Sequence, residues 1–181
     1  MLADARTALA SPRNADAPPS PFDIATMRSL ADFTALSLAT EHPTVFGAEI
    51  VDTKTGKSLM RSLNAVFPQH DPSAHAEVYT IRLACAKLKS PWLKGYTLYT
   101  TCEPCPMCMA CILWSGLDRI VYGATIDDAA RFGDQIMIYA KDMTKHWAHP
   151  CIVDGPVERE RCLALFTDPK MQAEFKRWKA R

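Results

Sequence analysis

Apolar residues along this chain follow two different spacings. From about residue 24, stretches with apolar residues three or four positions apart alternate with short runs rich in β-branched and aromatic residues. Residues 1–20 are rich in Ala, Pro and Ser, show no such period, and are expected to form a flexible leader. Residues 21–181 are too short for two independent domains and are expected to form one.

Helices are predicted from the apolar spacing and from residues that favour helix ends. One helix is expected to begin near Asp71-Pro72-Ser73, because Asp can cap a helix and Pro suits its first position. Another is expected to stop at Ser115-Gly116. The predicted helices are residues 24–38, 71–88, 105–114 and 127–130. A further helical segment is predicted at the C-terminus and ends in residues 176–181.

Strands are predicted where β-branched and aromatic residues gather between turn signals. Residues 46–52 and 58–64, joined by a turn at 53–56, form a predicted hairpin. Further strands are predicted at 96–101, 119–124 and 151–153. Strands that alternate with helices predict an α/β fold, a three-layer α/β/α sandwich around a central mixed sheet.

Charge and hydropathy exclude several classes of protein. Lys and Arg number 21 against 20 Asp and Glu, so the overall charge gives no attraction to nucleic acid or to a membrane. No apolar run approaches the ~18 residues of a membrane helix, and the N-terminus lacks a secretory signal pattern. A cytoplasmic protein is therefore expected.

Cysteine usage changes the picture more than charge does. Four of the seven cysteines fall within ten residues, at Cys102, Cys105, Cys108 and Cys111. Disulfides at such close spacing would be strained, so metal binding is the better interpretation. The isolated Cys85, Cys151 and Cys162 are expected to be ordinary buried residues.

Two short motifs carry the candidate chemistry: His75-Ala-Glu77 and Pro104-Cys-Pro-Met-Cys108. Together they match the His-x-Glu and Pro-Cys-x-x-Cys signature of zinc deaminases. Two residues between Cys105 and Cys108 place both sulfurs on one face of a first helical turn, where the helix dipole favours thiolates.

The donor set indicates a catalytic zinc site with one Zn²⁺ per chain. His75, Cys105 and Cys108 supply three ligands and leave a fourth position for water. Such water needs a proton acceptor, and Glu77, two residues from a ligand, is expected to act as the general acid/base without binding the metal.

Other interpretations of the cysteines stay open at this point. Pro-Cys-x-x-Cys alone also occurs in structural zinc sites and redox dithiols. The even spacing of the four cysteines is similar to an iron–sulfur ligand run, but that run needs three residues before its fourth Cys and then a Pro. Here two residues precede Cys111, and Ile112 follows it.

Residues from Phe46 to about Tyr139 resemble the cytidine/deoxycytidylate deaminase superfamily, and within it the guanine-deaminase branch. The resemblance rests on Phe46-Gly-Ala-Glu-Ile-Val, Asn64, His75-Ala-Glu-Val, Leu98-Tyr-Thr-Thr-Cys-Glu-Pro-Cys-Pro-Met-Cys and Trp114-Ser-Gly-Leu. It implies a cytidine-deaminase-like fold. It also implies that Asn64 binds the base, that Phe46 and Trp114 line its pocket, and that the backbone around Ala76 meets the substrate.

Two of the chain's departures from that branch concern the pocket; in a third, Cys111 stands at a position that is usually small. Guanine deaminases carry Gly-Phe-Asp-Asp after the last core strand, whereas this chain has Arg131-Phe-Gly-Asp134, so Asp134 corresponds to the acidic pocket residue. The family closes the pocket with an aromatic residue near the C-terminus. Phe175 or Trp178 is the candidate here, from the same chain or from a second subunit.

The resemblance implies hydrolytic deamination of guanine, or a close purine, to xanthine and ammonia. A transfer-RNA adenosine deaminase and a cytosine or cytidine deaminase are the enzyme alternatives, and a non-catalytic zinc or iron–sulfur module is the alternative of a different class. A nucleobase or nucleoside substrate and a homodimer are expected. Nucleic acid is disfavoured because Asp127 and Asp128 are acidic and basic residues gather only at 176–181.

Overall fold

The computed structural model describes residues 18–179, so residues 1–17, most of the expected leader, and residues 180–181 lie outside it. The strands are β1 (Gly47–Asp52), β2 (Ser58–Leu63), β3 (Tyr96–Cys102), β4 (Arg119–Ala124) and β5 (Ile152–Asp154). The helices are α2 (Pro21–Ala35), the 3-10 helix η1 (Leu36–Ala39), α3 (Val66–Gln69), α4 (Ala76–Leu88), α5 (Pro106–Ser115), α6 (Ile126–Ala130), α7 (Ala140–Thr144), α8 (Arg159–Thr167) and α9 (Pro169–Lys179).

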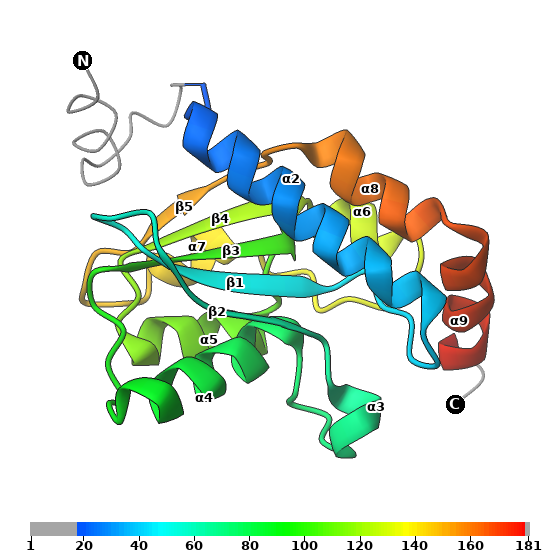
Figure 1. Ribbon diagram of the computed structural model, residues 1–181, viewed down its shortest axis with the longest axis horizontal. Helices are drawn as coiled ribbons and strands as arrows, with labels where there is room; N and C mark the ends of the chain where they lie inside the picture. Colours follow the sequence, from blue (N-terminus) through cyan, green and yellow to red (C-terminus); the bar gives the residue numbers. More distant parts are fainter. Residues whose placement is uncertain (1–17, 180–181) are drawn as a thin grey trace.

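The strands form one mixed sheet in the order β2-β1-β3-β4-β5. Strand β1 pairs antiparallel with β2 and with β3, whereas β3-β4 and β4-β5 are parallel. Helices cover both faces, with α4 and α5 on one and α2 and α8 on the other (Figure 1). The predicted three-layer α/β/α sandwich with a mixed sheet is therefore confirmed.

The start of α4 differs from its prediction. The helix begins at Ala76, with His75 as the residue before it, rather than near Asp71-Pro72-Ser73. The Asp71 carboxylate accepts a hydrogen bond from the backbone N–H of Ser73 at 2.8 Å and pairs with Arg82 at 2.6 Å. Asp71 thus stabilises a turn instead of a helix end, and this turn leaves His75 at the helix terminus.

Other boundaries follow the sequence more closely. The hairpin forms as predicted, with Gly47 opposite Leu63, and α5 ends at Gly116 in a left-handed conformation with φ of 72°. The C-terminal helical segment is divided into α8 and α9, and the short helices α3 and α7 carry no periodic signal that could predict them.

Strand direction places the carboxyl ends of β2, β3 and β4 at one edge of the sheet, together with the amino end of β1. Asn64 follows β2, the Cys105 motif follows β3, and the segment with Asp134 follows β4. Phe46 directly precedes β1. The candidate residues thus converge at this edge although they are far apart in sequence.

Two apolar cores hold the layers together. One lies between the sheet and helices α2, α8 and α9 and includes Met27 and Phe166. The other lies between the sheet and helices α4 and α5 and includes Ile50 and Met109. Burial of this apolar area is the main force that fixes the helices on the sheet. Among the described helices, none has the length and apolar character needed to cross a membrane.

A buried ionic cluster ties α2 to the sheet on the first of these faces. The Arg119 guanidinium donates to Asp23 at 2.8 Å and pairs with Asp154 at 2.7 Å, and the Tyr99 hydroxyl donates to Asp23 at 2.7 Å. Burial alone would raise the pKa of Asp23, but hydrogen bonds from Arg119 and Ser20 lower it to about 2. The carboxylate is therefore ionised in the folded protein at neutral pH.

Replacement of Arg119 should destabilise the fold strongly. We expect Arg119→Met to cost about 3–5 kcal/mol of unfolding free energy in urea titrations at pH 7, because it leaves the Asp23 charge buried without its guanidinium. Arg161→Met, which breaks an exposed pair with Asp32, is the matched control and should cost less than about 1 kcal/mol. Equal losses in the two variants would contradict the role of the buried cluster.

Candidate active site

The first motif lies where the chain enters α4. His75 occupies the position before the helix, and Glu77 lies in its first turn. The backbone N–H of Ala65, just after β2, donates to the carbonyl of Ala74 at 2.9 Å. This bond ties the segment before His75 to the exit of β2 and so fixes the imidazole at the carboxyl edge of the sheet.

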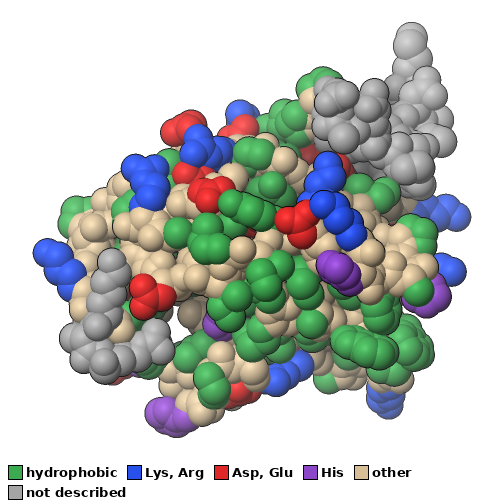
Figure 2. Space-filling view, turned by 180° about the vertical axis from the view of Figure 1, so that it is seen from behind, with side chains coloured by type: hydrophobic (Ala, Val, Ile, Leu, Met, Phe, Trp, Pro, Cys, Tyr) green, Lys and Arg blue, Asp and Glu red, His purple; other side chains and the backbone are tan. Residues whose placement is uncertain are grey.

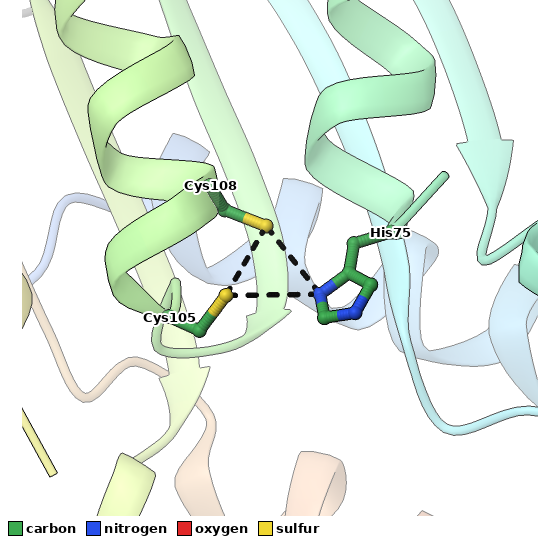
Figure 3. Close-up of side chains that lie close together, drawn as sticks. All are labelled: His75, Cys105 and Cys108. Atoms are coloured by element: carbon green, nitrogen blue, oxygen red, sulfur yellow. Dashed lines mark hydrogen bonds between the residues drawn. The ribbon is translucent and has the colours of Figure 1, made fainter. Parts of the chain in front are cut away.

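The second motif lies where the chain enters α5. Cys105 precedes the helix, Pro106 is its first residue, and Cys108 lies in its first turn, as the sequence predicts. Pro at this position costs no hydrogen bond, because the first N–H groups of a helix have no partner within it. Helices α4 and α5 lie side by side on the same face of the sheet, so their starts are neighbours (Figure 3).

Three donor atoms from these two helix starts form a compact triangle (Figure 3). The two sulfurs lie 3.6 Å apart, and His75 Nδ1 lies 3.7 Å from Cys105 Sγ and 3.6 Å from Cys108 Sγ. Tetrahedral zinc, with Zn–S bonds of ~2.3 Å and Zn–N bonds of ~2.0 Å, separates two sulfurs by ~3.8 Å and sulfur from nitrogen by ~3.5 Å. The residues therefore fit a zinc ion with one coordination position left open.

The charges of these groups suit metal binding. The hydrogen bond shared with Cys108 and the contact with His75 lower the pKa of Cys105 to about 4, against the effect of burial. Interaction with Cys105 and burial raise the pKa of Cys108. Zinc binding would displace the proton of that thiol, since thiol ligands bind as thiolates.

Glu77 lies beside the triangle rather than in it. Its carboxylate is buried, with Oε2 3.6 Å from Cys108 Sγ. Burial, opposed by the charge of His75, raises the pKa of Glu77. A carboxyl group that exchanges a proton readily and lies next to a metal position can serve as a general acid/base.

The other two cysteines of the run lie outside this group. Within residues 18–179, the one cluster of His, Cys, Asp or Glu side chains that could hold a metal is His75, Cys105 and Cys108. Cys102 is buried with its Sγ 3.9 Å from the Thr125 carbonyl, and Cys111 lies half-buried on α5. This arrangement does not fit the iron–sulfur alternative, which needs the cysteines of the run around one cluster.

A cavity of about 800 Å³ opens next to the triangle. Its polar wall includes Asn64, Glu77, Glu103, Asp134 and Gln135. Its apolar wall includes Phe46, Phe67, Phe166, Phe175 and Trp178. Aromatic walls with a few convergent polar groups are typical of sites for flat heterocyclic ligands.

Three of the residues expected to bind substrate line this cavity: Phe46, Asn64 and Asp134. The Phe46 ring packs edge-on against Phe166, with the ring centroids 5.7 Å apart. The Asn64 side-chain oxygen accepts the backbone N–H of Val66 at 3.2 Å, which orients the amide. Its NH₂ group is then available as a donor toward the cavity.

Trp114 and Ala76 are placed differently. Trp114, expected to line the pocket, does not line this cavity: its side chain is 68% exposed and packs edge-on against Trp147. Helix α5 carries it away from the carboxyl edge of the sheet, where the zinc ligands lie. Ala76 is buried between the two motif residues that line the cavity.

Several cavity residues were missed by sequence reasoning. Phe166 and Phe67 carry no local signal, because nothing in α8 or α3 distinguishes a cavity wall from a core position. Glu103 stands directly before the Pro-Cys motif, and this position could have marked it. Phe175 and Trp178, the candidates for the closing aromatic residue, both lie on the cavity of their own chain.

Comparison with known proteins agrees with this geometry. Residues 22–124 match the family model described as the cytidine and deoxycytidylate deaminase zinc-binding region. The matched region holds both metal motifs, Asn64 and Phe46.

Individual relatives point the same way. The guanine deaminase of Bacillus subtilis is 37% identical over 137 residues, which cover 74% of this chain and 79% of that protein. A transfer-RNA-specific adenosine deaminase of Agrobacterium fabrum is 33% identical over 58% of this chain and 68% of that protein. The crystal structure of a NE0047 variant in complex with 8-azaguanine superposes with a TM-score of 0.74, at 26% identity, over 92% of this chain and 90% of that one.

Substitution of the cysteines should separate metal ligands from bystanders. We expect Cys105→Ser and Cys108→Ser to lose zinc, measured by elemental analysis of purified protein, because each removes one of three ligands. Cys102→Ser and Cys111→Ser are the matched controls from the same run and should retain one zinc per chain. Equal dependence on all four cysteines would contradict the assignment.

Proposed function

This chain belongs to the cytidine and deoxycytidylate deaminase zinc-binding family, and we propose that it converts guanine, or a close purine, to xanthine and ammonia by hydrolysis. The observation that carries the proposal is the single cavity in which the metal triangle, Glu77 and Asn64 face one another between aromatic walls. The similarity to a guanine deaminase and to a protein that binds 8-azaguanine supports guanine as the base.

The reaction breaks the bond between a ring carbon and its amino group and forms a carbon–oxygen bond from water. A zinc ion bound by His75, Cys105 and Cys108 would supply Lewis-acid activation that brings the pKa of water down to about 7. Glu77 takes up a proton from that water and passes protons to the ring nitrogen and to the departing amine, which leaves as ammonia. Burial keeps Glu77 away from bulk solvent, so the proton stays at the reaction centre.

The cavity walls account for recognition of a flat base. Phe46 and Phe166 present aromatic surface to the base. Asn64 offers its NH₂ group as a donor, whereas Asp134 accepts from the N–H groups that guanine carries on its edge. This combination favours a base with both donors and acceptors on its edge.

The cavity wall argues against a transfer-RNA substrate. Trp178 of α9 and Phe67 of α3 meet on this wall, with ring centroids 5.9 Å apart. An adenosine held in an RNA loop would need an open path lined by basic side chains. Arg177 is the basic residue on the cavity wall, and its guanidinium pairs with Glu174 at 3.0 Å.

We also propose that the protein is a homodimer and is located in the cytoplasm. Large apolar side chains remain exposed at Trp92, at Trp114 and along the segment Ile136–Tyr139. Figure 2 shows apolar side chains gathered on the lower part of the face that it presents. Exposed apolar patches of this kind mark association surfaces. The seven cysteines are free thiols, as in proteins of a reducing compartment.

A substrate panel tests the function directly. Zinc-loaded protein should release ammonia from guanine at least about tenfold faster than from adenine, cytosine or guanosine, measured as kcat/KM in a coupled ammonia assay. Asn64→Ala should lower kcat/KM for guanine and make the kcat/KM values of the different bases more alike, because the oriented amide is lost. Faster release from adenosine in a transfer-RNA anticodon stem-loop would establish the alternative substrate.

Substitution of the proton carrier should separate metal binding from turnover. We expect Glu77→Gln, which preserves size but cannot exchange a proton, to keep one zinc per chain and to lose ~10²–10⁴-fold in kcat. Elemental analysis and steady-state kinetics on the same sample read both quantities. Loss of zinc, or a fall in kcat of less than about tenfold, would contradict the role of Glu77.

A further inference from the structure

Glu103 is a buried carboxylate on the cavity wall that the proposed chemistry does not use. It stands two residues before the ligand Cys105 and is 7% exposed. Both of its oxygens accept backbone N–H groups: Oε2 from Ile126 at 3.1 Å and Oε1 from Ala140 at 2.9 Å. Its own backbone N–H donates to the carbonyl of Ala124 at 2.8 Å.

The two N–H groups are the ends of one segment. Ile126 is the first residue of α6 and Ala140 is the first residue of α7. Between them lies the substrate loop, residues 131–139, which brings Gly133, Asp134 and Gln135 to the cavity wall. A single carboxylate therefore joins both ends of the segment that contains this loop.

On its far side, the substrate loop is held by Glu103 at Ala140 and by the Tyr139 hydroxyl, which donates to Asp127 at 3.2 Å. Helix α7 has no side chain of its own that caps its N-terminus, so the carboxylate of Glu103 takes that role. Residues Ile136–Tyr139 are exposed rather than packed against the core. On the near side, Phe132 packs against Phe166 and Phe175. The place of Asp134 thus depends on how the two ends of the segment are held.

We propose that Glu103 is a positioning residue that sets base selectivity by coupling the substrate loop to the metal motif. Since Glu103 and Cys105 lie in the same three-residue segment between β3 and α5, one short piece of backbone fixes the zinc ligand and the ends of the loop together. Asp134 and Gln135 are thereby held at a constant distance from Glu77. This inference rests on the proposed function for its substrate, but the anchoring itself does not depend on turnover.

Glu103→Gln tests the coupling with minimal change of shape. Its amide keeps one acceptor oxygen, but its NH₂ group then faces a backbone N–H and cannot accept from it. Glu49→Gln is the matched control, because Glu49 is an equally buried carboxylate that pairs with Arg61 on the β1–β2 hairpin and lies outside the cavity.

The first readout is kinetic. We expect Glu103→Gln to keep one zinc per chain, to raise KM for guanine about tenfold with a smaller change in kcat, and to alter the ratio of kcat/KM for guanine over 2,6-diaminopurine. Asp134→Asn alone should lower kcat/KM for guanine strongly. Added to Glu103→Gln, it should lower kcat/KM only slightly further. An unchanged selectivity ratio, additive losses, or loss of zinc would overturn the proposal.

The second readout is hydrogen exchange of the zinc-loaded protein without substrate. Glu103→Gln should speed amide exchange at Ile126, at Ala140 and across residues 131–139, whereas Glu49→Gln should leave this region unchanged. Unchanged amide exchange in Glu103→Gln would overturn the proposal that Glu103 holds the ends of the substrate loop. Absence of guanine turnover in the unsubstituted protein would overturn the proposed function instead, so the two failures are distinguishable.

Discussion

The candidate metal site takes its ligands from the starts of two helices, and the rest of the molecule brings those two starts together. The donor atoms of His75, Cys105 and Cys108 lie within 4.8 Å of one another, although about thirty residues separate the two motifs. The antiparallel strand β1 lies between β2 and β3, which therefore run in the same direction. Helices α4 and α5 both follow strands that end at the same edge, so their N-termini meet there.

The same constraint determines what surrounds the metal position. Segments that leave β2, β3 and β4 provide Asn64, Glu103 and Asp134, and the segment that enters β1 provides Phe46. The opposite layer adds the aromatic wall from α8 and α9. Polar groups therefore come from loops at the sheet edge, whereas apolar surface comes from packed helices, a combination that suits flat heterocyclic ligands.

The surroundings of three of the buried carboxyl groups differ, and so do their roles. Glu77 lies beside the metal ligands, where burial, opposed by the charge of His75, raises the pKa of its carboxyl and suits it to proton transfer. Asp23 is paired with Arg119, which holds the pKa of this carboxyl at about 2 and gives it a structural role. Glu103 accepts two backbone N–H groups and joins the ends of the segment that lines the cavity.

Local sequence determined the features that depend on short-range spacing. Two residues between Cys105 and Cys108 place both sulfurs on one helical turn, and the alternation of strands and helices predicted the layered fold. The turn at Asp71 and the position of Trp114 were decided by tertiary structure. Asp71 pairs with Arg82 eleven residues away, and the direction of α5 carries Trp114 away from the edge where its motif begins. The places of Phe166 and Phe67 on the cavity wall could not be predicted from the sequence either. Contacts between distant segments depend on how whole layers pack, and periodicity within one segment does not encode them.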